Sequence, residues 1–489
     1  MVSAVLFITF FVLLVLNVPI SVCLGLSSAA AILYSGTSLT IVATNIYSGI
    51  SKFLLLAIPF FVLSGNIMAK AGISTRLIRF VDTCVGHRKG GIANVCIIVA
   101  CFFGAISGSG PATVAALGAV LIPAMIERGG FSAAFSTALM ATSSSIAIVI
   151  PPSIAFVVYA SITGVSIGDM FMAGIIPGIL MGLALVVVVM LEVRRDHVVP
   201  SNVEKASAKE RWNAFKDAFW GFLMPVIILG GIYGGIFTPT EAAAVSVVYG
   251  LFVGMIIYKE VKFKDLWEIL IDSAKTTGGI MLIVACASLF SFVCTRFGIS
   301  TAASELLARV AGNQFTFLLI CNIIFLIAGC FIDANSAMYI FIPIMLPVCK
   351  ALGYNVIAFG IMATVNLAIG QVTPPVGVNL FVAIGIKLRD GIRVTLQEIS
   401  RAVVPMVAAS IVVLLIITYI PQISTCLPAA LGSAAAIEND ETVGGDSGTT
   451  QTDNDDFNTI GDYSDLDWAD MTWNFTCSTT ETSTWAQAG

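Results

Sequence analysis

Charge is scarce in this chain. Asp, Glu, Lys and Arg make up only 11% of its 489 residues, and 58% of the residues are hydrophobic. An ordinary soluble domain has about 25% charged and about 45–50% apolar residues. Ten or more apolar runs, each close to the roughly 20 residues that cross a bilayer, recur as far as Pro421. The composition therefore excludes a soluble domain and predicts an all-α polytopic membrane protein.

Basic residues are missing from the N-terminal end, where the first is Lys52. A secretory signal carries a basic segment before its apolar core, so we expect residues 1–35 to belong to the membrane structure. Asn17 and Pro19 leave two possibilities for this segment, since they either split it into two spans or kink a single one.

Catalytic signatures are also missing. The 11 cysteines are scattered without a Cys-x-x-Cys pair, which favours apolar filler over a metal or disulfide role. There is no His-Glu-x-x-His sequence, and the two histidines, His87 and His197, lie in basic loops. An intramembrane enzyme needs a nucleophile with a base, or a metal cluster, so we do not expect an enzyme.

Basic residues fall in four clusters between the apolar runs: 70–89, 194–211, 259–264 and 387–393. Such loops stay in the cytoplasm, which fixes most of the path. From Ser433 onward there are 12 acidic and no basic residues, so residues 1–432 carry a formal charge of +7. The tail, 433–489, is rich in Asp, Thr, Ser and Gly, and we expect it to be disordered and periplasmic.

Two apolar blocks cannot cross the membrane if these loops are cytoplasmic. Blocks 92–125 and 315–349 must each begin and end on one side. As a single helix of about 35 residues, each would be roughly 50 Å long, too long for a core of about 30 Å. Each is interrupted near its middle, by "SGSGPAT" (107–113) and "IDANSAM" (332–338). They are predicted to be re-entrant hairpins that enter to half depth, one from each face.

The chain contains two Pro-Pro pairs, and they lie in related segments. "MATSSSIAIVIPPSIAFVVYASI", from Met140, aligns with "MATVNLAIGQVTPPVGVNLFVAI", from Met362, with one inserted residue. Broken helices are therefore predicted at 132–162 and 355–386, each after a hairpin. The halves 1–192 and 216–425, joined by a basic cytoplasmic loop at 193–215, form an inverted repeat of the kind found in secondary transporters.

Prolines donate no backbone hydrogen bond, so the pairs release carbonyl groups of Ala147, Ile148, Gly370 and Gln371. Irregular backbone at membrane depth is tolerated where it lines a cavity, and these oxygens suit a hard cation. Nearby hydroxyl groups lie at 107, 109, 143–145 and 373. The first cluster has no acidic side chain, which favours Na⁺. The second cluster contains Asp333, which leaves three roles open there: ion binding, proton binding and simple helix capping.

Each hairpin tip begins a returning helix, at Gly110-Pro111 and after Asp333. Helix starts present free N–H groups and partial positive charge, so two of them at the midplane suit a carboxylate substrate without a buried Arg. Asn366, Gln371 and Asn379 face either the substrate or neighbouring helices. The predicted substrate residues are Gly110, Thr113, Ser144, Ser145, Asn335, Asn366, Gln371 and Asn379. Thr238 and Glu241 form a predicted capping box of structural importance.

The stretches "SGSGPATVAALG", "IPPSIAFVVYA", "TPTEAAAVSVVYG" and "QVTPPVGVNLFV", in this order, resemble the large membrane subunit, DctM, of tripartite ATP-independent periplasmic (TRAP) transporters. The resemblance covers about residues 1–425. It implies an ion-transporter-like elevator fold in a bacterial inner membrane, Na⁺-coupled import of an organic acid such as a C4-dicarboxylate or sialic acid, and no cofactor other than the coupling ion. It also implies two partners, a small four-helix membrane subunit (DctQ type) and a periplasmic binding protein (DctP type).

The same resemblance implies two sodium sites. The first joins Ser107 and Ser109 to backbone around Ile146, Val149 and Pro151, and the second joins the Asp333 hairpin to Gly370, Thr373 and Pro375. A carrier of similar hairpin architecture that works without a binding protein is the alternative within transport.

Overall fold

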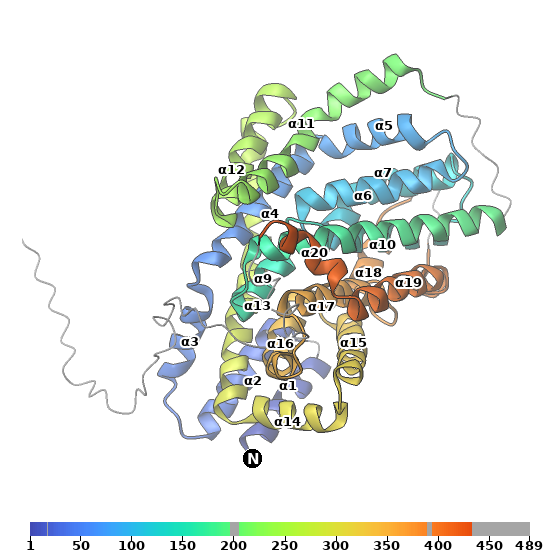
Figure 1. Ribbon diagram of the computed structural model, residues 1–489. Helices are drawn as coiled ribbons and strands as arrows, with labels where there is room; N and C mark the ends of the chain where they lie inside the picture. The colour runs from blue at the N-terminus through green and yellow to red at the C-terminus, as the bar shows by residue number, and fades with distance from the viewer. Residues whose placement is uncertain (17, 196–204, 389–393, 433–489) are drawn as a thin grey trace, which may run out of the picture. The chain divides into compact units, whose positions relative to one another are not determined.

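The computed structural model describes residues 1–16, 18–195, 205–388 and 394–432, and each regular element in this part of the chain is a helix (Figure 1). Nine of the described helices are long and apolar enough to cross a membrane. The chain is therefore a multi-pass α-helical membrane protein. The predicted acidic tail, Asn17 and His197 lie outside the described residues.

The first half of the chain begins with short helices and ends with a long one. Its elements are α1 Val2–Val15, α2 Ile20–Tyr34, α3 Thr40–Ile50, η1 Phe53–Leu56, α4 Ala57–Lys70, α5 Ile73–Val85, α6 Gly91–Ser107, α7 Gly110–Glu127, α8 Ala133–Ser145, η2 Ile146–Ile148, α9 Ile154–Thr163 and α10 Ile167–Arg195.

The second half repeats the order hairpin, broken helix, further helix. Its elements are α11 Ala208–Tyr233, α12 Pro239–Leu251, η3 Phe252–Ile257, α13 Phe263–Arg296, α14 Ile299–Ala311, α15 Gln314–Phe331, α16 Ala334–Ala351, α17 Val356–Gly370, α18 Val378–Ile384, α19 Leu396–Tyr419 and α20 Gln422–Ala430.

The N-terminal segment forms two helices rather than one kinked helix, because α1 and α2 pack against each other. The loop between the halves is shorter than the predicted interval 193–215. Helix α10 continues to Arg195, and α11 begins at Ala208 with a capping box formed by Ser207 and Glu210. The predicted capping box of Thr238 and Glu241 at the start of α12 is confirmed, with both of its reciprocal hydrogen bonds present.

One of the basic clusters also contains a helix that the charge pattern alone did not indicate. Helix α5 buries Ile73, Leu77 and Val81, which recur every four residues and so share one face. That face packs against α6 and α11. The spacing of these three residues in the sequence was the available signal.

Both predicted hairpins are present. Helices α6 and α7 pack against each other and are separated by two residues, and so are α15 and α16. Each arm has 17 or 18 residues and is therefore about 27 Å long. Insertion to half depth, which stays a prediction, requires the arms to be strongly tilted or to extend beyond the hydrocarbon core.

Most helix contacts fall within two sets. The frame set comprises α1–α5 and α11–α13, and the hairpin set comprises α6–α10 and α15–α20, while α14 connects the two sets and packs on α13, α15 and α16. Helix α13 packs on α2, α3 and α4 within the frame set, whereas α10 packs on α6, α17 and α19 within the hairpin set (Figure 1). The two sets meet mainly where α4 and α5 touch α6 and where α13 touches α16.

A hydrogen bond between the sets involves Lys52, just before η1. Its ammonium donates to the carbonyl oxygen of Ser161, near the C-terminal end of α9, over 2.6 Å. Burial lowers the pKa of Lys52. A cation is favourable at this end of a helix, where the backbone carbonyls carry partial negative charge.

Each hairpin touches its broken helix through a glycine. A Cβ atom at Gly104 of α6 would lie 2.6 Å from the Cα of Ala147, and one at Gly370 of α17 would lie 2.6 Å from the Cα of Gly329. Ala147 and Gly370 both precede the first proline of their pair by four residues. The same backbone contact therefore recurs at matching places in the two halves.

Candidate functional site

The first hairpin tip is a cluster of hydroxyl groups. Gly108 has φ +60°, a left-handed conformation that suits glycine, and Ser109 precedes the first residue of α7. The hydroxyl groups of Ser107 and Thr113 lie 2.9 Å apart, and Thr113 Oγ1 donates to the carbonyl oxygen of Ser109 over 2.8 Å. The side chain of Ser109 makes no capping hydrogen bond, so its oxygen can accept a ligand.

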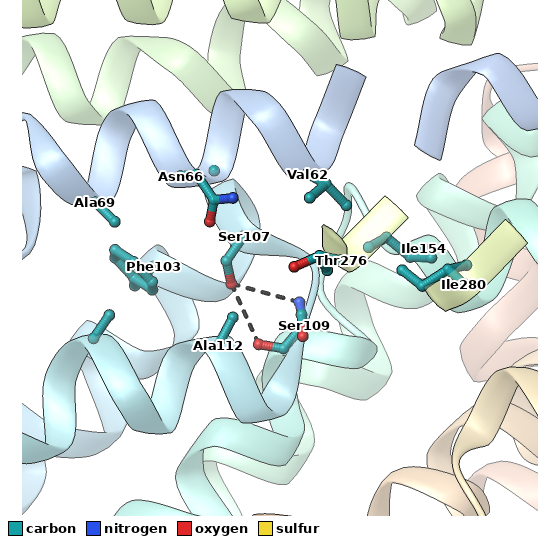
Figure 2. A pocket seen from close by; sticks show the side chains of 12 residues that line it. Val62, Asn66, Ala69, Phe103, Ser107, Ser109, Ala112, Ile154, Thr276 and Ile280 are labelled. Atoms are coloured by element: carbon teal, nitrogen blue, oxygen red, sulfur yellow. Dashed lines mark hydrogen bonds between the residues drawn. The ribbon is translucent and has the colours of Figure 1, made fainter. Parts of the chain in front are cut away.

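A small cavity of about 110 Å³ lies beside this tip (Figure 2). Ser107 and Ser109 line it from the hairpin, Thr276 from α13, and Asn66 from α4. Asn66 Nδ2 donates to Ser273 Oγ over 2.8 Å, which fixes α4 to α13. The hydroxyl groups of the first hairpin tip therefore share this cavity with Asn66 and Thr276 of the frame set.

The first broken helix satisfies several of its own carbonyl groups. Ile146 O accepts hydrogen bonds from the amides of Val149 and Ile150, each over 2.9 Å. Ile148 O, which was predicted to be released, accepts a hydrogen bond from the Ser153 hydroxyl. Val149 O points toward Gly174 of α10. Coordination of Na⁺ by Ile146 would have to compete with its existing bonds.

Ser153 has a double role that leads to a prediction. Its oxygen caps α9 by accepting from Phe156 N, and its hydroxyl donates to Ile148 O. Ser153→Ala should lower stability by about 2 kcal/mol, because it removes a cap worth about 1 kcal/mol and leaves a buried carbonyl unpaired. The measurement is thermal unfolding of the purified protein.

The control for this prediction is Ser132→Ala. Ser132 caps α8 by accepting from Phe135 N and has no second partner among the described hydrogen bonds, so its loss should cost about 1 kcal/mol. Equal destabilisation by the two substitutions would show that the bond to Ile148 contributes nothing.

The second hairpin tip is organised by Asp333. Its Oδ2 accepts from Asn335 N and Ser336 N over 3.0 and 3.1 Å, and its Oδ1 accepts from the Ser336 hydroxyl. Asp333 therefore caps α16, one of the roles that the sequence left open. Both oxygens already have partners on the helix that Asp333 begins.

The second broken helix also bonds to itself. Gly370 O accepts from Thr373 N over 2.9 Å, and Gln371 O accepts from Asn379 N over 3.1 Å. Thr373 Oγ1 donates to Ile369 O over 2.8 Å. Three of the four carbonyl groups predicted to be released thus have a partner within the chain. Each carbonyl oxygen has two lone pairs, so these bonds still leave room for a cation.

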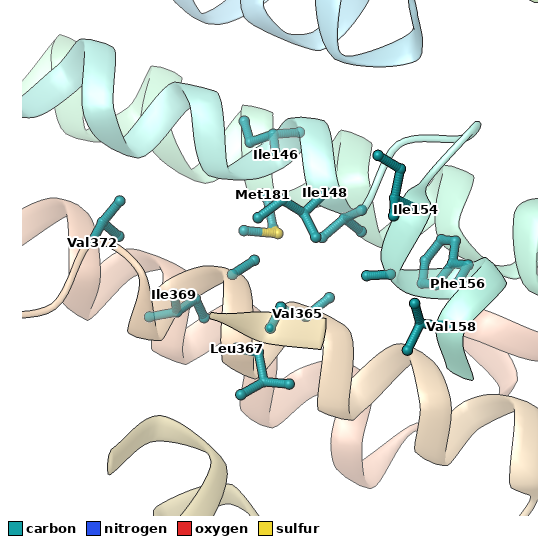
Figure 3. Close-up of a cluster of buried hydrophobic side chains, with 14 of the residues drawn as sticks. Ile146, Ile148, Ile154, Phe156, Val158, Met181, Val365, Leu367, Ile369 and Val372 are labelled. Atoms are coloured by element: carbon teal, nitrogen blue, oxygen red, sulfur yellow. The ribbon is translucent and has the colours of Figure 1, made fainter. Parts of the chain in front are cut away.

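Apolar side chains join the two broken helices behind these tips. Ile146 and Ile148 of the first half, Met181 of α10, and Val365 and Ile369 of the second half form one buried cluster (Figure 3). This packing holds the two irregular segments within a single hydrophobic core.

A larger pocket of about 380 Å³ lies between the hairpin tips. Ser109 and Gly110 line it from the first tip, and Asp333 and Asn335 from the second, together with Gln371 of the second broken helix. Gln371 is only 5% exposed, and its Oε1 and Asn335 Oδ1 have no hydrogen-bond partner. The starts of α7 and α16 therefore border one cavity, which also contains two unpaired amide oxygens.

The structure brings together three of the eight predicted substrate residues, Gly110, Asn335 and Gln371, at this pocket. The others lie elsewhere. Asn366 is fully buried and donates to Asn322 O and Oδ1 of α15, each over 2.8 Å. Its position indicates a packing role, one of the two interpretations left open.

The remaining predicted residues are buried around the pocket. Asn379 lies against Gly110 and donates to Ser144 Oγ over 3.3 Å. Ser145 donates to Thr142 O, one turn back in α8. Thr113 belongs to the first tip, and its hydroxyl is engaged there. Asn379 thus joins the second broken helix to elements of the first half.

Helix α13 contributes residues to the pocket that sequence reasoning missed: Lys275, Thr276 and Gly279. Lys275 Nζ lies 3.5 Å from Asp272 Oδ1. The signal was present in the sequence, because ionisable residues inside an apolar span are functional candidates by default. Both residues lie within α13, which is long and apolar enough to cross a membrane.

Comparison with known proteins identifies the family to which this chain belongs. The family model of the DctM component of tripartite ATP-independent periplasmic transporters matches residues 7–423. The chain is 38% identical to the C4-dicarboxylate TRAP transporter large permease protein DctM of Rhodobacter capsulatus, covering 86% of this chain and 97% of that one. It is 41% identical to the protein of the same name from Pseudomonas aeruginosa, covering 84% and 94%.

The fold is also similar to that of a solved transporter of unusual topology, YdaH of Alcanivorax borkumensis. The TM-score is 0.56 at 14% sequence identity, and the match covers 80% of this chain and 88% of that one. The family is named as a transporter component, which points to transport rather than to enzymatic catalysis. The chain belongs to the DctM family, the large permease component of TRAP transporters.

Proposed function

We propose that this chain is the transport subunit of a Na⁺-coupled importer of an organic acid. The observation that carries the proposal is the pocket between the hairpin tips, which is bordered by the start of α7, where no side chain caps the helix, and by the amide side chains of Asn335 and Gln371. Helix starts attract anions through free N–H groups and partial positive charge. A carboxylate of the substrate binds there, and the names of the two DctM relatives support a C4-dicarboxylate as the cargo.

Sodium binds at the two sites formed by a hairpin tip and its broken helix. The first tip offers the oxygens of Ser107 and Ser109 and contains no acidic side chain. Neutral oxygen ligands of this kind suit a hard monovalent cation better than a proton. In the second half, Thr373 and the backbone of Gly370 and Pro375 supply the oxygens near the Asp333 tip.

Transport proceeds by an elevator motion of the hairpin set against the frame set. The support for this step is the distribution of contacts, since the hairpins, broken helices and α10 pack chiefly on one another. A rigid group of this kind can carry the pocket past α13 while α13 stays with α2, α3 and α4. The inverted orientation of the two halves provides the second, equivalent position.

The chain works with two partners in the inner membrane of a bacterium. A small four-helix membrane subunit of the DctQ type and a periplasmic binding protein of the DctP type complete the tripartite system that the family name denotes. The alternative, a carrier that needs no binding protein, predicts uptake by the chain alone, whereas our proposal predicts none without the binding protein.

The experiment is thermal unfolding of the purified chain as NaCl replaces choline chloride at constant ionic strength. A ligand that binds the folded state stabilises it by about 1.4 kcal/mol at ten times its Kd. We expect a saturable rise in Tm that is specific for Na⁺, and Ser109→Ala and Thr373→Ala should each weaken it. Thr316→Ala serves as the control, because Thr316 lies at the far end of the second hairpin.

If Na⁺ causes no specific rise in the Tm of the wild-type protein, sodium coupling at these sites is contradicted. Uptake into proteoliposomes that contain the partners then tests transport separately from the coupling ion. Uptake that does not depend on Na⁺ would show that the chain is a transporter driven by another ion.

A further inference from the structure

A short polar stretch interrupts the long apolar helix α13. It runs from Asp272 to Gly279, and its charged side chains are exposed, Asp272 by 59% and Lys275 by 73%. Both residues lie within a helix that is long and apolar enough to cross a membrane, and a charge that faces lipid within such a span is costly. This face of α13 therefore borders water, and the same face lines the pocket through Lys275, Thr276 and Gly279.

Lys275 is the single Lys or Arg among the described residues that line the pocket. Across the pocket, the carboxylate of Asp333 is already bonded to the first turn of α16. Gln371 Oε1 and Asn335 Oδ1 are unpaired. The polar groups of the pocket that remain free are therefore two amide side chains and the start of α7 on the hairpin side, and one ammonium on the α13 side.

The present partner of Lys275 is easily exchanged. Asp272 Oδ1 lies 3.5 Å away on the same helix, and both side chains are mostly exposed. Exposed ion pairs contribute little because water and salt screen them. A carboxylate that enters the pocket can replace Asp272 without the loss of a strong interaction.

We propose that Lys275 binds the second carboxylate of a dicarboxylate substrate whose first carboxylate is held at the start of α7, at the first hairpin tip. This inference rests on the proposed function and adds to it the residue that selects a dianion. Because α13 belongs to the frame set, the substrate site is completed by a helix that does not travel with the hairpins. The contact therefore forms only in the position of the hairpin set seen in this structure.

Binding of succinate and of succinamate, in which a neutral amide replaces one carboxylate, tests this proposal. The two probes are nearly identical in shape and differ by one charge. Affinities are measured by calorimetry in NaCl for the wild-type chain, Lys275→Met, Lys275→Arg and the control Lys264→Met, which removes an exposed lysine near the start of α13, away from the pocket.

We expect the wild-type protein and Lys264→Met to bind succinate about tenfold more tightly than succinamate. Lys275→Met should bind the two equally, through loss of succinate affinity alone, and Lys275→Arg should restore the preference. A preference that survives in Lys275→Met, or an equal loss for both probes, would overturn the proposal. Failure of the wild-type protein to bind succinate would also overturn this proposal. The proposed function is tested separately, by Na⁺-dependent stabilisation and by uptake into proteoliposomes.

Discussion

Gly104→Ala and Gly370→Ala are each expected to destabilise the protein by about 3 kcal/mol, at the upper end of the usual cost of an overpacked core. A Cβ atom at Gly104 would lie 2.6 Å from the Cα and 2.8 Å from the Cβ of Ala147. At Gly370 it would lie 2.6 Å from the Cα and 2.7 Å from the carbonyl carbon of Gly329. Helix backbone cannot rotate out of the way as a side chain can, so the hairpin and its broken helix must separate.

The measurement is thermal unfolding together with the yield of monodisperse protein on size exclusion. Gly230→Ala is the control, because it adds the same methyl group to a helix at a place with no neighbouring atom within 4 Å. It should be neutral or stabilise the protein by up to about 1 kcal/mol through helix propensity. Normal stability of Gly104→Ala or Gly370→Ala would contradict the close approach of the paired elements in that half.

The hairpins and broken helices were predictable because their signals are local. Glycine and serine mark the break at the first hairpin tip, the capping residue Asp333 marks the second, and the Pro-Pro pairs mark the same step in both halves. The breaks fall where these residues indicate, at Gly108–Ser109, Ile332–Asp333 and the two proline pairs. Capping by Thr238 and Asp333 follows from side-chain chemistry within three residues and was accessible for the same reason.

The partners of the freed carbonyl groups could not be read in the same way. Counting donors lost to proline predicts unpaired oxygens at Ile148 and Gly370, but the chain bends back and supplies Ser153 and Thr373 as donors. This geometry depends on backbone angles after the break, which the sequence does not determine. The sequence thus locates the irregular segment more reliably than it identifies the oxygens free to bind an ion.

Residues whose roles depend on tertiary contacts were the hardest to predict from the sequence. Asn366 and Gln371 are five positions apart in one segment, yet the first packs on α15 and the second lines the pocket. Lys275 lies far from both hairpins in sequence and meets them only because α13 packs against α16. Its charge was visible, but the cavity it faces is lined by five separate segments: the two hairpin tips, the two broken helices and α13.

Substitution of Asp333 separates its capping role from an ionic one. Asp333→Ala should lower Na⁺-driven uptake about tenfold, because loss of the N-cap costs about 1–2 kcal/mol and loosens the first turn of α16 at the pocket. Asp333→Asn and Asp333→Ser should retain most of the uptake, since both are good N-cap residues. The structure favours this result because both carboxylate oxygens are already bonded to Asn335 and Ser336.

Uptake is measured in proteoliposomes with the partners present, under a Na⁺ gradient and, separately, under a pH gradient. Asn313→Ala is the matched control, because Asn313 caps the outer end of the same hairpin by accepting from Thr316 N over 2.9 Å. It should lose similar stability while uptake stays near normal. Loss of uptake in Asp333→Asn and Asp333→Ser as well as in Asp333→Ala would show that the negative charge itself is needed, and Asp333 would then act as an ion or proton ligand in addition to beginning α16.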